Sequence, residues 1–138
     1  MGDTSEEIQE KRGAVSSRIA AMLKTRPIMR LFNEVDGFML RYGHGSEIDG
    51  RLNRTMPYDE ALEADDDALR EFIHKATPCR EQLQSDIERY TEKKNALTKL
   101  LHQAVDNHYW YEVDELSSKA KWVIKDLKSL MVTLRQVV

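Results

Sequence analysis

Residues 77–138 read TPCREQLQSDIERYTEKKNALTKLLHQAVDNHYWYEVDELSSKAKWVIKDLKSLMVTLRQVV. Apolar side chains recur in this stretch at spacings of three, four or seven residues, the pattern of amphipathic helices. One series comprises Cys79, Leu83, Ile87, Tyr90, Leu97, Leu101 and Ala104, and a second comprises Trp110, Val113, Leu116, Ala120, Val123, Leu127, Leu130, Leu134 and Val138. The break between them is Asp106-Asn107-His108. Two helices of about 40 Å joined by so short a break should pack antiparallel, so we predict a long helical hairpin over 78–138.

The apolar stripe also assigns roles to individual residues of this hairpin. Thr77-Pro78 combines a threonine cap with a first-turn proline, which favours a helix start at that point. Cys79 and Trp110 lie on the stripe and should be buried. The alternative for Cys79 is a reactive thiol, because it lies in the first helical turn beside Arg80. Lys94 interrupts the stripe, and we expect its stem to lie along the seam with the ammonium at the edge. The alternative is a polar seam residue that sets register or oligomeric state, as in coiled coils.

The N-terminal half is predicted to form a second, shorter helical hairpin over residues 4–42. Its first helix, 4–25, buries a thin stripe, and its second, 27–42, has a richer apolar face and ends at Gly43. The first stripe consists of Ile8, Val15, Ile19, Met22 and Leu23, and the second of Ile28, Leu31, Phe32, Val35, Phe38, Met39 and Tyr42.

Residues 43–56 are rich in glycine and polar side chains and are predicted to form a loop. An acidic helix should follow over 57–76, with a break near Ala64 as the alternative. No strand pattern is evident. The predicted fold class is therefore all-α: about five helices in a single domain, 1–138, forming a bundle dominated by the long C-terminal antiparallel hairpin.

Composition narrows the class of protein. The chain has 138 residues, of which 41% are hydrophobic and 33% charged, enough for a globular domain with its own core. Its single cysteine cannot form an internal disulfide. A membrane-spanning helix needs about 18 consecutive apolar residues, and no stretch of the sequence comes near this length. We expect a soluble intracellular protein, cytoplasmic or nuclear. The net charge of −3 argues against dedicated nucleic-acid binding, although the basic C-terminal helix leaves contact with an anionic surface open.

The sequence contains no recognisable catalytic motif, and we expect a protein that is not an enzyme and has no cofactor. His102 and His108 flank the predicted turn with Asp106 between them. This spacing lacks the i, i+4 pairing that places two ligands on one helix face. A small helical metal-binding or enzymatic protein built on these residues is the alternative.

The run His108-Tyr109-Trp110-Tyr111 opens the second long helix. Tyr109 and Tyr111 cannot share the direction of Trp110, so they should point away from the stripe at the hairpin tip. Aromatic side chains with polar ends are enriched at protein interfaces. An equally weighted alternative is that they pack beneath the N-terminal half.

From these patterns we predict a non-enzymatic protein–protein interaction module, an adaptor or regulatory subunit that binds through helix faces. Its candidate partner-binding residues are His108, Tyr109, Tyr111, Lys121 and Lys125. The partner would be another protein or a second copy of the chain.

One short stretch resembles a known family. Val105-Asp106-Asn107, Trp110, Lys119 and Trp122 are similar to the substrate-binding helical hairpin of J-protein co-chaperones. The resemblance covers about thirty residues at generic helix positions. It implies a co-chaperone-like hairpin, but the chain lacks the His-Pro-Asp tripeptide through which that family stimulates its chaperone partner.

Overall fold

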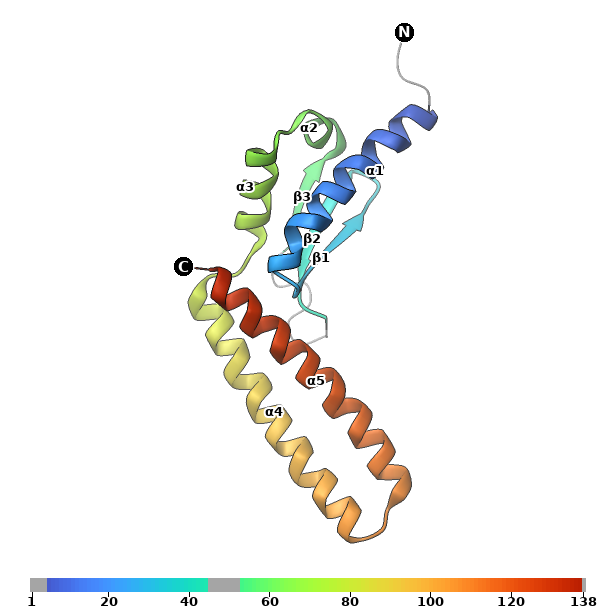
Figure 1. Ribbon diagram of the computed structural model, residues 1–138, viewed down its shortest axis with the longest axis vertical. Helices are drawn as coiled ribbons and strands as arrows, with labels where there is room; N and C mark the ends of the chain where they lie inside the picture. The colour runs from blue at the N-terminus through green and yellow to red at the C-terminus, as the bar shows by residue number, and fades with distance from the viewer. Residues whose placement is uncertain (1–4, 45–52, 138) are drawn as a thin grey trace. The chain divides into compact units, whose positions relative to one another are not determined.

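The computed structural model describes residues 5–44 and 53–137. The chain divides after Pro78 into two compact units, and the boundary coincides with the predicted start of the long hairpin. Unit 1, in blue to green in Figure 1, contains helices and a sheet, and unit 2, in yellow to red, contains two helices. The fold is mainly helical, but the sheet means that the all-α prediction is wrong in part.

Unit 1 begins with a helix, as expected, and continues as a β-meander. Its elements are α1 (Ser5–Met22), the 3₁₀ turn η1 (Leu23–Thr25), β1 (Met29–Asn33), β2 (Gly37–Tyr42), β3 (Asn53–Pro57), α2 (Tyr58–Glu63) and α3 (Asp66–Ala76). The strands lie in the order β1-β2-β3, and both neighbouring pairs are antiparallel.

The predicted helix over 27–42 is wrong, because these residues form a β-hairpin. The side chains of β2 alternate: Phe38, Leu40 and Tyr42 are buried, whereas Met39 and Arg41 are only half-buried. This period of two belongs to a strand with one covered face. Asp36-Gly37 closes the turn, a typical hairpin signal.

The predicted 43–56 loop is also partly wrong. Residues 53–57 form β3, which pairs with β2 in a register that places Phe38 opposite Met56. Residues 45–52 of this predicted loop lie outside the described residues. Gly37 stands so close to β3 that a Cβ there would collide with the backbone of Met56 and Pro57, which explains why the residue is a glycine.

One face of the sheet carries the core of unit 1. The helices α1, α2 and α3 all contact the strands. The buried apolar side chains are Val15, Ile19, Leu23, Ile28, Met29, Phe38, Leu40, Tyr42, Met56, Ala61, Leu69, Phe72, Ile73 and Ala76. The strand register places Arg30, Phe32, Met39 and Arg41 together on the opposite face, where none of them is fully buried.

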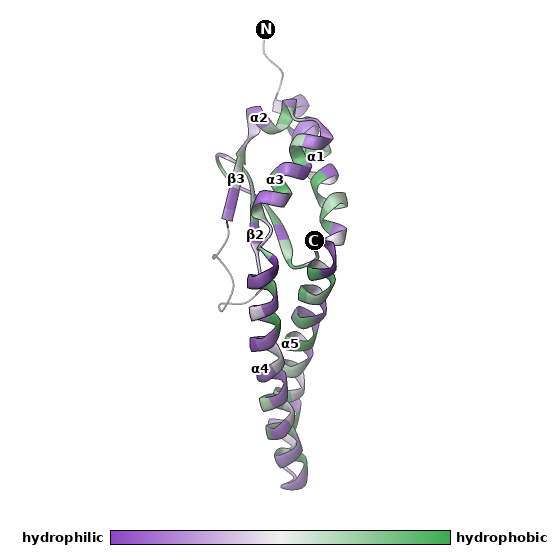
Figure 2. Ribbon diagram, turned by 90° about the vertical axis from the view of Figure 1, so that its left-hand side faces the viewer, coloured by the Kyte–Doolittle hydropathy of each residue, from purple (hydrophilic) through white to green (hydrophobic). Residues whose placement is uncertain are grey.

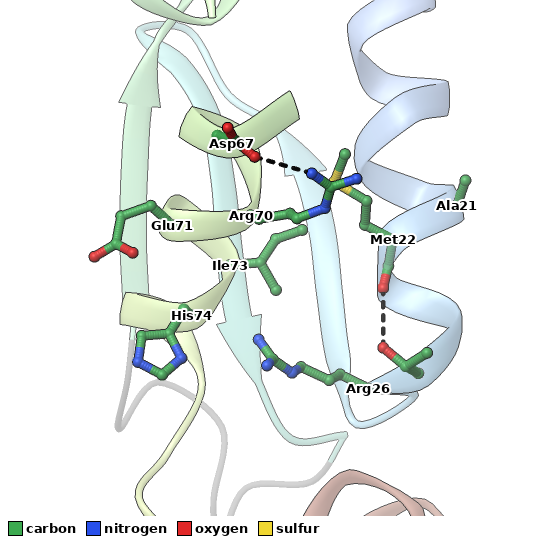
Figure 3. A pocket seen from close by; sticks show the side chains of 9 residues that line it. Ala21, Met22, Arg26, Asp67, Arg70, Glu71, Ile73 and His74 are labelled. Atoms are coloured by element: carbon green, nitrogen blue, oxygen red, sulfur yellow. Dashed lines mark hydrogen bonds and ion pairs between the residues drawn. The ribbon is translucent and has the colours of Figure 1, made fainter. Parts of the chain in front are cut away.

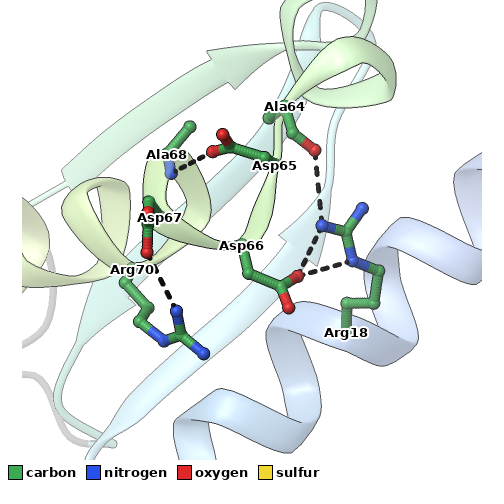
Figure 4. A network of polar contacts seen from close by, with 7 residues as sticks. All are labelled: Arg18, Ala64, Asp65, Asp66, Asp67, Ala68 and Arg70. Carbon is green, nitrogen blue, oxygen red and sulfur yellow. Dashed lines mark hydrogen bonds and ion pairs between the residues drawn. The ribbon is translucent and has the colours of Figure 1, made fainter.

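The acidic stretch 57–76 contains the break near Ala64 that the sequence offered as an alternative. Ala64 has an extended ψ of 134°, which ends α2. Asp65 then caps α3, and its carboxylate accepts a hydrogen bond of 2.8 Å from the Ala68 N–H (Figure 4). Because this cap satisfies an otherwise unpaired helix N–H, the aspartates at 65–67 do more than form a solvated acidic face.

Unit 2 is the predicted antiparallel hairpin. It consists of α4 (Arg80–Asp106) and α5 (Trp110–Gln136), which pack along their length. Figure 2 shows hydrophobic residues along the helices among more hydrophilic ones. The start of α4 differs from the prediction: Thr77 caps the end of α3, and Cys79 is the N-cap of α4 and is exposed. The expected burial of Cys79 is therefore wrong.

The hairpin seam is only partly enclosed. Leu83, Tyr90, Ala104, Val123 and Leu130 are buried, whereas Leu101, Leu127 and Lys94 are half-buried. The half-buried state of Lys94 agrees with a stem lying along the seam. Trp110 is 59% exposed, so the prediction that it belongs to the core is wrong.

Candidate functional site

A hollow of about 470 Å³ lies between α1 and α3 in unit 1 (Figure 3). Several of its polar side chains have partners. Arg70 pairs with Asp67 at 3.1 Å, and the Thr25 hydroxyl donates to the Met22 carbonyl. Arg26 donates to the Thr77 hydroxyl, and its partial burial lowers its pKa. Neither serine nor cysteine lines this hollow.

The histidines do not form a metal centre in the part of the chain that the structure describes. Within 5–44 and 53–137, no three His, Cys, Asp or Glu side chains gather closely enough to hold a metal ion. His102, Asp106 and His108 are therefore not brought together as ligands, although the turn they flank forms where the sequence placed it.

The turn between α4 and α5 is tightly built from backbone hydrogen bonds. The Asn107 side chain donates to the Gln103 carbonyl at 2.9 Å, and the Tyr109 N–H donates to the Ala104 carbonyl at 2.9 Å. His108 has a φ of 57°, the left-handed conformation that reverses the chain after a helix. These contacts hold the residues that follow in a defined orientation.

Aromatic side chains project from this turn. We call His108, Tyr109, Trp110 and Tyr111 the aromatic tip. Tyr109 is 56% exposed and Tyr111 is 83% exposed. The rings of His108 and Trp110 meet edge to face with centroids 5.5 Å apart. Exposure of both tyrosines agrees with their predicted direction away from the stripe.

A shallow hollow of about 380 Å³ lies beside the tip, between α4 and α5. Tyr109 forms part of its wall, and Leu100 and Leu116 contribute apolar surface. Its charged side chains include Glu115 and Lys119, which pair with each other at 3.4 Å. The lining is therefore mixed, with apolar side chains beside amide and charged ones.

The two lysines predicted to contribute lie farther along α5. Lys121 and Lys125 are exposed, but they stand about 17 and 23 Å from the helix start, given the rise of a helix. Lys125 lies over the ring of Trp122, with its Nζ 4.9 Å from the centroid. Trp122 is 61% exposed, and sequence reasoning did not single it out as a surface residue.

The face of the sheet opposite the core holds a second arrangement that sequence reasoning missed. Arg30 and Arg41 are directly opposite each other on β1 and β2, and both guanidinium groups lie over Phe32, at 5.2 and 5.7 Å from its centroid. Cation–π attraction offsets the repulsion expected of like charges across strands. The sequence signal for this arrangement is that Arg30 and Phe32, like Met39 and Arg41, are two residues apart. This spacing places them on one face only if the segment is assigned as strands.

No protein-family model, curated protein or solved structure matches this chain. The resemblance of residues 105–122 to the J-protein hairpin therefore gains no support. Among the described residues, no helix combines the length and apolar character needed to cross a membrane. Function has to be inferred from the side chains themselves.

Proposed function

We propose that this chain is a non-enzymatic protein–protein interaction module that binds a partner protein through the aromatic tip of the α4–α5 hairpin. The observation that carries the proposal is the exposure of Tyr109 and Tyr111 on a turn held by its own hydrogen bonds. Large apolar surface is costly to leave in water. Consecutive aromatics held in this way, beside a hollow, are best explained by a partner that covers them.

Rigidity favours the tip as a binding site. Tyrosine loses little conformational entropy on binding, because it has only two side-chain torsions, and it offers both an apolar ring and a hydroxyl. The turn holds the backbone of Tyr109 and Tyr111 in one conformation, so less conformational entropy is lost when the partner binds. The adjacent hollow, with Leu100 at its base, can accept an apolar side chain of the partner.

The proposal is tested by comparing proteins captured from the native source by the wild-type chain and by two variants. In Tyr109→Ala/Tyr111→Ala the tip loses both tyrosines. In Trp122→Ala an aromatic that is 61% exposed, close to the 56% of Tyr109, is removed from α5, which makes it the control. We expect the partner to be lost with the double variant and retained with the control.

Affinity for the recovered partner then gives the quantitative result. Truncating an interface anchor typically costs more than about 1–2 kcal/mol of binding free energy, while exposed side chains contribute little to the stability of the free chain. The melting temperature should therefore stay close to the wild-type value. If the double variant retains every protein that the wild type captures, or binds the recovered partner with unchanged affinity, the tip is not the binding site.

A further inference from the structure

The hairpin of unit 2 leaves one of its long sides uncovered. The seam follows a heptad pattern with two kinds of position, a and d. The d positions are Leu83, Tyr90, Leu97 and Ala104 on α4 and Leu116, Val123 and Leu130 on α5. The a positions are Ile87, Lys94 and Leu101 on α4 and Val113, Ala120, Leu127 and Leu134 on α5. Most d side chains are buried, whereas every a side chain is only half-buried. Because a single pair of helices encloses only one side of such a seam, the a side stays open.

Four of the eight e positions beside the a positions are apolar. They are Val105, Trp110, Ile124 and Met131, exposed by 42%, 59%, 38% and 44%, and the other four are Gln84, Thr91, Thr98 and Ser117. On a helix, e lies next to a, so the apolar e side chains widen the half-buried a layer at the tip and along the C-terminal half of α5. We call the a and e residues of both helices the open face. The unexpected exposure of Trp110 follows from its place on this face.

The size of the open face fits a stable dimer. Helices of 27 residues are about 40 Å long, and two helices side by side are about 20 Å wide. The resulting area of about 800 Å² per copy is what a stable interface of standard size buries on each partner.

The charges that border the open face identify the occupant. The b positions flank it on its outer edges. On α4 they hold Glu81, Glu88, Asn95 and His102, and on α5 they hold Asp114, Lys121, Lys128 and Arg135. All eight are exposed. Among the described residues, no ion pair engages Glu88, Lys128 or Arg135.

The register of these charges is complementary to itself. Because α4 and α5 have equal lengths about a turn centred on His108, residues whose numbers add to about 216 lie at the same height. Glu81 is then level with Arg135, and Glu88 is level with Lys128. In one hairpin these residues occupy opposite outer edges. A second hairpin stacked with its tip at the same end would bring α4 of one copy onto α5 of the other, acid against base.

We propose that the chain forms a two-fold symmetric dimer through the open face, a four-helix bundle with both aromatic tips at the same end. Stacking with the tips at opposite ends would place α5 of one copy on α5 of the other. Lys121 would then face the basic stretch of the other copy's α5, which is unfavourable. The dimer would present two aromatic tips side by side, so that a partner with two binding sites gains avidity. Dimer formation does not depend on what the tip binds.

The first test is the mass of the full-length chain in solution, measured by sedimentation equilibrium over about 1–100 μM, a range that covers typical weak to moderate affinities. We expect a reversible monomer–dimer equilibrium. A monomer throughout this range, at both low and high salt, would overturn the proposal. Because the tip tyrosines lie outside the open face, loss of the dimer and loss of the partner can be told apart with separate variants.

A matched pair of variants locates the interface. Ile124→Glu places a charge on the open face, and Val132→Glu places one on the outer side of the same helix at nearly equal exposure, 38% against 36%. We expect Ile124→Glu to weaken dimerisation about 100-fold or more, because an unpaired carboxylate would be buried. Val132→Glu should change it by less than about threefold. Circular dichroism confirms that both variants fold. Equal effects of the two would contradict the assignment of the face.

Orientation is tested by charge reversal. Glu88→Lys should weaken the dimer about two- to tenfold by placing two lysines opposite each other, and the effect should fade at high salt. Adding Lys128→Glu should restore the affinity, because the exchanged pair is complementary again. Failure of this rescue would exclude the stacking with tips together.

A spin label at the tip gives an independent readout of orientation. The label is attached to Asp106→Cys in a Cys79→Ser background, and the distance between labels in the dimer is measured. Tips at the same end predict about 20 Å, the width of the bundle, whereas tips at opposite ends predict about 40 Å, the length of the helices. The longer distance would overturn the proposed arrangement.

Discussion

Arg18 and Asp66 join the middle of α1 to the first turn of α3. The Arg18 Nη2 lies 2.6 Å from Asp66 Oδ1, and its Nε lies 3.1 Å from the same oxygen (Figure 4). The Nη2 group also donates to the Ala64 carbonyl at 3.3 Å. One guanidinium thus satisfies a carbonyl at the break between α2 and α3 and a carboxylate at a helix N-terminus, where negative charge is favoured.

This ion pair predicts a pH dependence of unit 1. Hydrogen bonding and charge attraction from Arg18 hold the pKa of Asp66 below its ordinary value of 3.8. A carboxyl whose pKa is lowered in the folded state contributes stability that is present above pH 3.8 and lost as the pH falls through the folded pKa. The contribution is small because both side chains are partly exposed. In urea titrations, Asp66→Asn should therefore lose less stability than the wild type on acidification.

Asp67→Asn is the control for the Asp66 variant. Asp67 belongs to the same acidic stretch but pairs only with Arg70 on its own helix, and its side chain is 91% exposed. If Asp66→Asn matches the wild type below pH 3.8, the ion pair contributes nothing in solution.

The glycines of α1 and β2 should respond oppositely to alanine. At Gly13 an added Cβ meets nothing within 4 Å, so Gly13→Ala should raise the free energy of unfolding by about 0.5–1 kcal/mol through helix propensity. At Gly37 the Cβ would collide with the Met56 carbonyl of β3. Gly37→Ala should lower the free energy of unfolding by about 1–3 kcal/mol. Denaturant melts of the two variants check both signs, and a stabilising Gly37→Ala would mean that β3 does not approach so closely.

The core of the hairpin should be more sensitive at d than elsewhere. Leu130 is fully buried at a d position, whereas Leu100 is 49% exposed. Leu130→Ala should cost about 2–5 kcal/mol of unfolding free energy, and Leu100→Ala less than about 0.5 kcal/mol. Chemical denaturation of both variants, at a protein concentration held fixed, measures the difference. Similar costs at the two positions would show that the seam has been assigned to the wrong face.

The sequence predicted the hairpin of unit 2 well because its information is local. Every turn of α4 and α5 repeats the same stripe, so the period of the pattern, the turn at Asp106-Asn107-His108 and the antiparallel packing follow without knowledge of the rest of the chain. The outward direction of Tyr109 and Tyr111 follows for the same reason. Periodicity shows which way a side chain points but not how deeply it is buried. Trp110 was assigned to the core only because it lies on the apolar stripe.

Strand pairing in unit 1 depended on contacts that the sequence does not display. Over 28–42 the apolar residues fit a helical stripe about as well as an alternating one. The choice between them is made by β3, whose Met56 pairs with Phe38, eighteen residues earlier in the chain. The Asp36-Gly37 turn was the local sign, but it carried too little weight against so many apolar residues. Cys79 shows the same limit on a smaller scale, since the helix start shifted by two residues and removed it from the stripe.

By itself the sequence determined one long amphipathic hairpin, its turn and the tyrosines at its tip, because helix periodicity is set by neighbours three and four residues apart. Only the tertiary structure decided that Met29–Pro57 contains a three-stranded sheet, that Arg30 and Arg41 meet over Phe32, and that the a side of the hairpin remains open. Each of these depends on which distant segments come together to remove a given side chain from water, and that is a property of the packed chain and not of any local stretch.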